Sequence, residues 1–279
     1  MLKQSFQKNI ISNVYKVIEE KKGKVFIMSV YSIYFSPTKS TEKVTKLIAG
    51  EFGKSQSIDL SDRNASFVKT FNEEDICIVG VPSYGGRVPD IAIQRMKQLK
   101  GNNAKVILVV TYGNRAYEDT LKELLFALEN DGFLCVAAIA AITEHSIMHQ
   151  FATGRPDAND QEELKAFANK IKDKINTTTE YEDITVPGNY PFKEYKGVPL
   201  KPRGNSSCIF CGQCADLCPV GAIPLDNYKK TDMDICISCM RCVEICPAHA
   251  RKVNSLMVKV AAKKMKAVCD VRKENELFL

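Results

Sequence analysis

The sequence predicts two folded units, a doubly wound α/β domain with a five-stranded parallel sheet and, after it, a small α+β domain. The first prediction rests on strand patterns that alternate with amphipathic helix patterns between residues 30 and 174. The second rests on eight of the 11 cysteines, which are confined to residues 208–246. A chain of 279 residues is long enough to give both units a core.

Five strand-like segments carry the α/β prediction. They are expected at residues 31–35, 57–60, 76–81, 106–111 and 133–142. The third and fourth are almost continuously apolar, which is typical of central parallel strands that helices cover on both faces. Apolar residues at helical spacing mark the intervening helices: Val44, Leu47, Ile48 and Phe52; Leu121, Leu124, Leu125 and Leu128; Leu164, Phe167, Ile171 and Ile175.

The chain is expected to divide into five parts. Residues 1–27 form a Lys-rich extension, for which a frayed helix and a true start at Met28 both remain open, and no function is assigned to it. Residues 28–176 form the α/β domain, and the polar, proline-bearing stretch 177–200 forms a linker. The cysteine-rich domain then covers residues 201–253, and an amphipathic helix in residues 254–279 closes the chain.

Two copies of one cysteine pattern occupy the second domain. Each has the form Cys-x2-Cys-x2-Cys-x3-Cys-Pro, and the second copy begins 28 residues after the first. This is the ligand run of bacterial two-cluster ferredoxins, in which three cysteines of a run hold one [4Fe–4S] cluster and the fourth ligates the other. Cluster I is then expected on Cys208, Cys211, Cys214 and Cys246, and cluster II on Cys236, Cys239, Cys242 and Cys218.

The spacing suits iron–sulfur chemistry. Each iron corner needs one soft thiolate, and two-residue gaps let a tight turn wrap three corners. Structural zinc is the alternative, because Cys-x2-Cys pairs also build zinc sites. Zinc ribbons place two pairs far apart and do not form triplets with a Cys-Pro fourth member, so iron–sulfur is favoured. Cys77, Cys135 and Cys269 lie outside the runs and are interpreted as small buried apolar residues.

Composition narrows the function classes. The net charge is +6, of which +5 comes from residue 201 onward, where 13 Lys and Arg face 8 Asp and Glu. Deprotonated cluster ligands would offset that excess, and aromatic residues do not alternate with basic ones, so nucleic acid is not the expected partner. The longest apolar stretch, residues 133–142, is too short for a membrane span. No secretory signal is visible, so we expect a reducing, cytoplasmic location.

A loop rich in hydroxyl groups joins the first strand to its helix, with Ser36, Thr38, Ser40 and Thr41 around Lys39. Hydroxyls and unpaired N–H groups at a helix N-terminus form an anion site, although an ordinary Ser/Thr N-cap is the simpler alternative. Neither a P-loop nor a Gly-x-Gly-x-x-Gly fingerprint is present. The loop resembles the phosphate loop of flavodoxins, which holds the FMN phosphate. Lys39 stands where flavodoxins usually have glycine.

Two further loops follow the third and fourth strands, at the edge where open α/β sheets bind ligands. Both combine glycine, which allows close backbone approach, with a tyrosine that can stack on a flat ring. They resemble the two isoalloxazine-binding loops of flavodoxins, with the tyrosines as candidate ring contacts. The predicted contacts are Pro82, Ser83, Tyr84, Gly85 and Gly86 in one loop, and Thr111, Tyr112, Gly113 and Asn114 in the other.

From about Met28 onward, the chain resembles the flavodoxin–ferredoxin fusion proteins of anaerobic bacteria, sometimes called ferrodoxins. The resemblance implies one FMN and two [4Fe–4S] clusters in a single chain. A flavin exchanges electrons singly or in pairs and each cluster exchanges one, so the implied function is an electron carrier that serves redox partner proteins. The resemblance does not imply the direction of electron flow.

Two alternatives remain open. The first domain could have lost FMN and serve to dock the ferredoxin on a partner enzyme, and Lys39 in the phosphate loop keeps this possibility open. The chain could also be a flavin-dependent reductase of a small molecule or nicotinamide. No catalytic triad or proton-transfer constellation is recognisable, so a carrier is favoured over a self-contained oxidoreductase. His145 follows the fifth strand and could approach a flavin, but we interpret it and His249 as structural.

Overall fold

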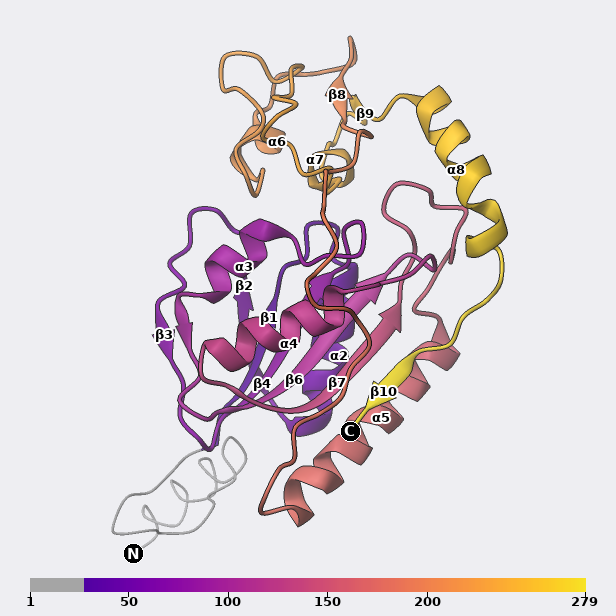
Figure 1. Cartoon of the computed structure of the whole chain (residues 1–279). Helices are drawn as coiled ribbons and strands as arrows, with labels where there is room; N and C mark the ends of the chain where they lie inside the picture. Colours follow the sequence, from indigo (N-terminus) through magenta and orange to yellow (C-terminus); the bar gives the residue numbers. More distant parts are fainter. Residues whose placement is uncertain (1–27) are drawn as a thin grey trace, which may run out of the picture.

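The computed structural model describes residues 28–279 of the chain, so the expected N-terminal extension lies outside the described residues. Its centre is a six-stranded sheet in the order β10-β7-β6-β4-β1-β2 (Figure 1). Five of these strands are parallel: β1 (Val30–Tyr34), β2 (Ser55–Asp59), β4 (Ile76–Pro82), β6 (Lys105–Tyr112) and β7 (Leu134–Ile142). Renumbered alone they give the order 2-1-3-4-5, which is the doubly wound, flavodoxin-like order. The five predicted strands are thereby confirmed.

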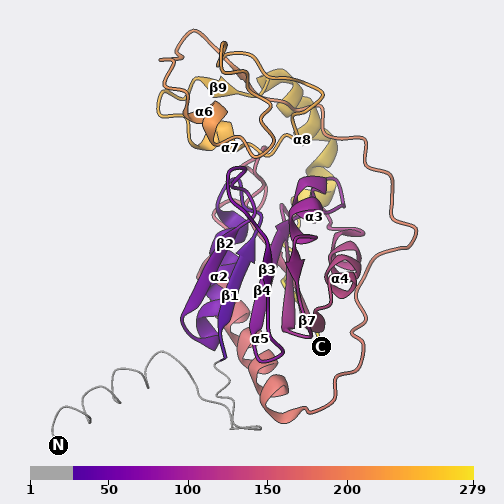
Figure 2. The same ribbon diagram turned by 90° about the vertical axis from the view of Figure 1, so that its left-hand side faces the viewer.

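Helices cover both faces of the sheet (Figure 2). One face packs against α2 (Ser40–Phe52) and α5 (Ala158–Thr177) through a core that includes Ile48, Ile107 and Ile171. The other face packs against α3 (Asp90–Met96) and α4 (Thr120–Asn130) through a second core. Neighbouring residues of β4 and β6 alternate between these cores, because successive side chains of a strand point to opposite faces.

The end of the chain adds an element that the sequence did not predict. Residues 254–279 were expected to form a closing helix, and α8 (Ser255–Cys269) is present. After it the chain returns to the sheet, where β10 (Glu276–Phe278) pairs antiparallel with β7 as a sixth strand. A three-residue strand leaves no periodic signal in the sequence, and its position depends on the free edge of β7.

Apart from Thr177, which ends α5, the predicted linker has no regular secondary structure, yet it packs on the α/β domain. Ile184 and Val186 are buried in the core that also contains α4. The Asp119 carboxylate, at the start of α4, accepts the backbone N–H of Asn189 at 2.9 Å and of Lys193 at 2.7 Å. The stretch is therefore held along the domain surface, and its end reaches the carboxyl edge of the sheet.

The cysteine-rich part is small and consists mostly of loops. It contains the paired strands β8 (Arg203–Gly204) and β9 (Arg251–Lys252), and the single-turn helices α6 (Gln213–Asp216) and α7 (Arg241–Glu244). Both views place it above one end of the sheet, with α8 running from it toward the α/β domain (Figures 1 and 2). A second pair of short strands, β3 (Lys69–Thr70) and β5 (Leu99–Lys100), borders the main sheet. Within residues 28–279, no helix has the length and hydrophobicity of a membrane span.

Candidate functional site

A cavity of about 630 Å³ lies at the carboxyl ends of the parallel strands. Its walls come from the loops after β1, β4, β6 and β7, from the end of the linker, from the cysteine-rich part and from α8. The volume is within the range of sites that hold a cofactor-sized ligand. The predicted site residues that line it are Thr38, Ser40, Thr41, Pro82, Ser83, Tyr84, Gly85, Thr111, Tyr112 and Gly113.

The loop after β1 presents hydroxyl groups to this cavity. Thr38, Ser40 and Thr41 line it, at the start of α2, where the first-turn N–H groups lack helical partners. Ser36 does not line the cavity. Its hydroxyl accepts the backbone N–H of Glu42 at 2.9 Å and so caps the first turn of the helix. Lys39 also lies off the lining. It adopts a left-handed φ of 64°, which costs a non-glycine residue about 1–2 kcal/mol, whereas glycine adopts it without this steric cost.

The loop after β4 is a tight turn closed by backbone hydrogen bonds between Tyr84 and Arg87. Gly85 and Gly86 both have positive φ, and a Cβ on Gly85 would lie 2.7 Å from the Tyr195 ring. A Cβ on Gly86 would overlap the Glu118 carboxylate, so Gly86 packs beside that side chain and is off the cavity lining. Burial raises the pKa of the Tyr84 phenol, and the nearby Cys239 acts in the same direction.

The loop after β6 supplies Tyr112, whose ring is largely buried. It packs edge-on against the Tyr117 ring, with the two ring centroids 5.1 Å apart. Asn114 was predicted to contact the flavin, but it is not part of the cavity wall. Its amide instead donates to the carbonyls of Cys269 at 2.7 Å and Val271 at 2.8 Å. Asn114 therefore fastens the end of α8 to the α/β domain.

The loop after β7 also lines the large cavity, although none of its residues was among the predicted ligand contacts. It contributes residues 143–148, among them His145. The His145 Nδ1 atom accepts the N–H of Ile147 at 3.2 Å and of Met148 at 3.3 Å. Burial lowers the pKa of His145 to about 4. The ring is therefore neutral near pH 7, with its proton on Nε2. Gly113 permits this packing, because a Cβ there would lie 2.7 Å from the His145 Cβ.

Helix α8 forms the outer wall, with apolar side chains that face open space. Leu256, Met257 and Val260 all line the cavity, yet 69%, 43% and 50% of their surfaces are exposed. The amphipathic stripe in the sequence indicated this apolar face, but not the surface opposite it. The helix is joined to the domain through a small core that includes Met148, Phe151 and Ala262.

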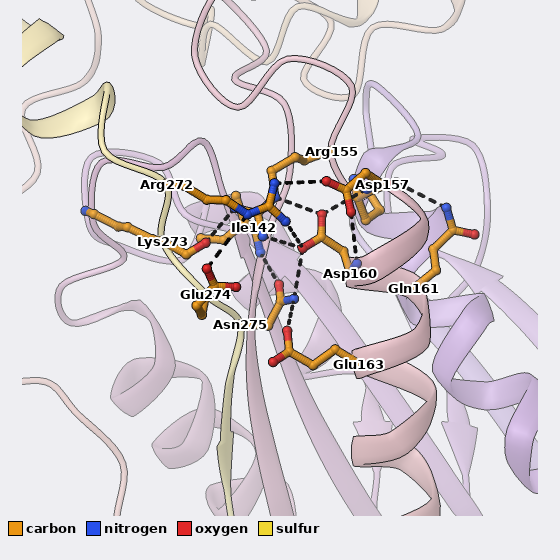
Figure 3. Close-up of polar contacts among 11 residues, drawn as sticks. Ile142, Arg155, Asp157, Asp160, Gln161, Glu163, Arg272, Lys273, Glu274 and Asn275 are labelled. Carbon is orange, nitrogen blue, oxygen red and sulfur yellow. Dashed lines mark hydrogen bonds and ion pairs between the residues drawn. The ribbon is translucent and has the colours of Figure 1, made fainter.

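A buried polar network holds the tail that follows α8 (Figure 3). The Asp160 carboxylate accepts the Arg155 Nε at 2.8 Å and the Asn275 Nδ2 at 3.2 Å. Asn275 Oδ1 in turn accepts the backbone N–H of Ile142, at the end of β7, at 2.9 Å. Arg272 bonds to the Asp157 carboxylate at 3.0 Å. The position of α8 is therefore fixed from both the loop after β6 and the start of α5.

The eight cysteines of the two runs line two smaller cavities in the cysteine-rich part. Cys208, Cys211, Cys214 and Cys246 surround the first, which we call the first cage. Cys218, Cys236, Cys239 and Cys242 surround the other, the second cage. Each cage thus combines three cysteines of one run with the fourth of the other. Among the described residues, no group of three or more His, Cys, Asp or Glu is arranged to hold a single metal ion.

The two cages have matching backbones. Left-handed φ values occur at Phe210 and at Ser238, the residues before the second cysteine of each run. Each run also has a backbone N–H that points at its fourth sulfur: Ala222 N lies 3.3 Å from Cys218 Sγ, and Ala250 N lies 3.3 Å from Cys246 Sγ. Such N–H groups favour the thiolate, the form in which cysteine binds metal. The donor set and its geometry therefore fit two [4Fe–4S] clusters.

The second cage adjoins the large cavity. Ile237 and Ser238, between the first two cysteines of the second run, line that cavity together with the loops after β1, β4 and β6. On the α3 side, the Arg95 Nη2 atom donates to the carbonyl of Pro219, next to Cys218, at 2.7 Å. Two separate contacts thus hold the second cage against the α/β domain.

Comparisons with known proteins found a family model for the cysteine-rich part and similar solved structures for the α/β domain. Residues 207–250 match the family model of the 4Fe-4S dicluster domain. The structure is similar to flavodoxin 1 from Bacillus cereus (16% identity, 55% of this chain and 99% of that chain, TM-score 0.38). It is also similar to a mutant flavodoxin from Fusobacterium nucleatum bound to flavin mononucleotide (13% identity, 53% and 95%, TM-score 0.37). The strand order, and not these distant similarities, is the basis for the term flavodoxin-like. No curated protein matched the chain.

Proposed function

We propose that this chain, which joins a flavodoxin-like domain to a 4Fe-4S dicluster domain, is an electron carrier with FMN in the large cavity and a [4Fe–4S] cluster in each cage. Bound FMN would exchange electrons singly or in pairs, and each cluster one at a time. The observation that carries the proposal is the shared wall: Ile237 lines both the cavity of the second cage and the large cavity, and the next residue, Ser238, lines the large cavity too. The two kinds of site are therefore neighbours within one chain.

The cavity residues suit a flavin nucleotide. Thr38, Ser40 and Thr41 supply hydroxyls at the start of α2, where an anionic phosphate is favoured. Tyr84 and Tyr112 offer aromatic surface, and Gly85 and Gly113 let the backbone approach a flat ring. The apolar face of α8 would cover the side of the cavity that faces outward.

The cages differ in their access to the outside. Cys239 of the second cage is buried near Tyr84, and burial raises the pKa of its thiol. Cys211 of the first cage is exposed, and the apolar Ile209 and Phe210 beside it are exposed too. The second cage thus faces the large cavity, and the first lies where a redox partner protein can reach it.

A flavin titration of the cluster-loaded protein tests this proposal. Thr38→Val keeps the shape of the side chain and removes the hydroxyl, so FMN affinity should fall by about 1–3 kcal/mol. Thr70→Val, at the exposed position of strand β3, is the matched control and should leave affinity unchanged. Equal affinities in both variants would mean that the phosphate is held elsewhere.

Anaerobic turnover with NADH or NADPH separates a carrier from a reductase. A carrier should show no steady-state oxidation of either nucleotide unless a partner protein is added. Sustained oxidation by the chain alone would favour the reductase alternative. Protein that takes up both clusters but no FMN would instead favour a flavin-free docking domain.

A further inference from the structure

Arg251 is a buried guanidinium beside the first cage. It lies in β9, only 2% of its surface is exposed, and it lines the same cavity as Cys208, Cys211, Cys214 and Cys246. A buried charge is strongly unfavourable unless hydrogen bonds and an opposite charge compensate it. The groups around the guanidinium therefore decide what holds it there.

Most N–H groups of the Arg251 guanidinium have acceptors in the protein, but its positive charge has no carboxylate partner. Its Nη1 donates to the carbonyl of Tyr228 at 2.6 Å, and its Nη2 donates to the carbonyl of Pro202 at 3.1 Å and to the hydroxyl of Thr231. Nη1 also donates to the carbonyl of Lys230 at 3.4 Å. All four acceptors are neutral. Nε is buried without a partner, and across residues 28–279 no carboxylate forms an ion pair with Arg251.

The ionisable groups that Arg251 does face are cysteines of both cages. Arg251 itself lines the cavity of the first cage, and two of its acceptors, Pro202 and Thr231, line the cavity of the second. Its positive charge also favours the thiolate of cysteines in both cages, among them Cys214 and Cys242. An oxidised [4Fe–4S] core of charge about 2+ with four deprotonated cysteines leaves a cage with a net charge of about 2−. Loaded cages would thus supply the negative charge that the rest of the structure does not.

We propose that Arg251 is the shared counter-charge of the two cages and sets the reduction potentials of both clusters. The inference rests on the cluster half of the proposed function and does not depend on FMN. Reduction adds one electron to a cage that is already negative, so a fixed positive charge nearby stabilises the reduced form. Removal of this charge should make both potentials more negative.

EPR-monitored anaerobic redox titration of the cluster-loaded, full-length protein tests the proposal. Arg251→Gln keeps hydrogen-bonding capacity without charge and should lower the equilibrium constant for reduction of each cluster about tenfold, a shift of about 59 mV. Arg251→Lys keeps the charge and should stay within about twofold of the wild type. Arg203→Gln removes an exposed charge from the paired strand β8 and should have no effect. Unchanged potentials in a fully loaded Arg251→Gln protein would overturn the proposal.

The iron content of each variant, measured before its titration, distinguishes loss of the clusters from a change in their reduction potentials. If Arg251→Gln does not take up clusters, Arg251→Lys decides: normal loading with wild-type potentials supports the counter-charge. Failure of the lysine variant as well would overturn the proposal and show that the guanidinium acts through its hydrogen bonds. Wild-type protein without iron would overturn the cluster assignment itself, and this proposal with it.

Discussion

The Ser238 hydroxyl donates a hydrogen bond to the carbonyl of Val198 at 2.9 Å, and both residues line the large cavity. Ser238 belongs to the second cysteine run and Val198 to the end of the linker. Because the linker also packs on the α/β domain, this bond ties the second cage to the cavity wall. The linker thus helps to hold the large cavity and the second cage next to each other.

The pairing of cysteines between runs can be tested with double variants. Cys208 and Cys246 line one cage, so Cys208→Ala with Cys246→Ala should remove a single cluster and leave about four irons. Cys208→Ala with Cys218→Ala removes a ligand from each cage and should leave almost none. Iron and sulfide analysis after anaerobic reconstitution gives the counts.

Cys77→Ala, in the core of the α/β domain, is the control for these variants and should keep about eight irons. The opposite ranking of the two double variants would show that each run ligates its own cluster with all four of its cysteines.

The apolar face of α8 should contribute to flavin binding. Val260→Ser places a hydroxyl on the cavity wall and should weaken FMN binding about fivefold, or about 1 kcal/mol, because apolar contact with the ligand is lost. Val268→Ser is the matched control: it lies in the same helix with 51% exposure against 50% for Val260, but away from the cavity. Quenching of FMN fluorescence measures both affinities. Equal losses would indicate a general effect on the helix.

Asn114 should determine how firmly α8 is held. Asn114→Gly keeps the positive φ of 64° and removes both hydrogen bonds to the end of the helix, a loss of about 1–3 kcal/mol in local stability. Amide hydrogen exchange in residues 255–269 should rise accordingly. Asn103→Gly, at an exposed position with φ of 63°, corrects for the effect of glycine on the unfolded chain. Unaltered exchange in α8 would contradict the anchoring role.

His145 should make the protein less stable as the pH falls. Its pKa is lowered to about 4 in the folded state, so below its ordinary value near 6.5 the unfolded chain binds the proton more readily. The stability from the neutral ring is present above pH 6.5 and is lost as the pH falls toward 4. Between pH 7.5 and 5.5 this loss should be about 1.4 kcal/mol.

Urea unfolding at the two pH values measures that loss. His145→Gln should remove this part of the pH dependence. His149→Gln, whose ring is exposed and pairs with Glu144, should retain it. If the free energy of unfolding of the His145 variant fell with pH as much as that of the wild type, the pH dependence would belong to other groups.

The sequence was sufficient for the parts of the fold that are periodic or locally encoded. Continuous apolar runs located β4 and β6, and the two cysteine runs indicated which four cysteines would surround each cage. The loops after β1, β4 and β6 could be placed at one edge because parallel strands end on the same side of a sheet.

Other features depend on tertiary contacts that leave no local pattern. Four residues that were predicted to contact the ligand do not line the cavity. Ser36 caps a helix and Lys39 forms a turn. Gly86 packs against Glu118, and Asn114 anchors α8. The surface that α8 faces is set by the return of the chain to β7, which the amphipathic stripe of the helix does not encode.

The most direct test of the account is the cofactor content of protein purified without oxygen. Flavin released by acid and iron measured on the same sample should approach one FMN and about eight irons per chain. That result would place both kinds of cofactor in one molecule, as the shared wall of the cavity and the second cage predicts. Iron-loaded protein that contains no flavin and takes up none when FMN is added would contradict the central claim.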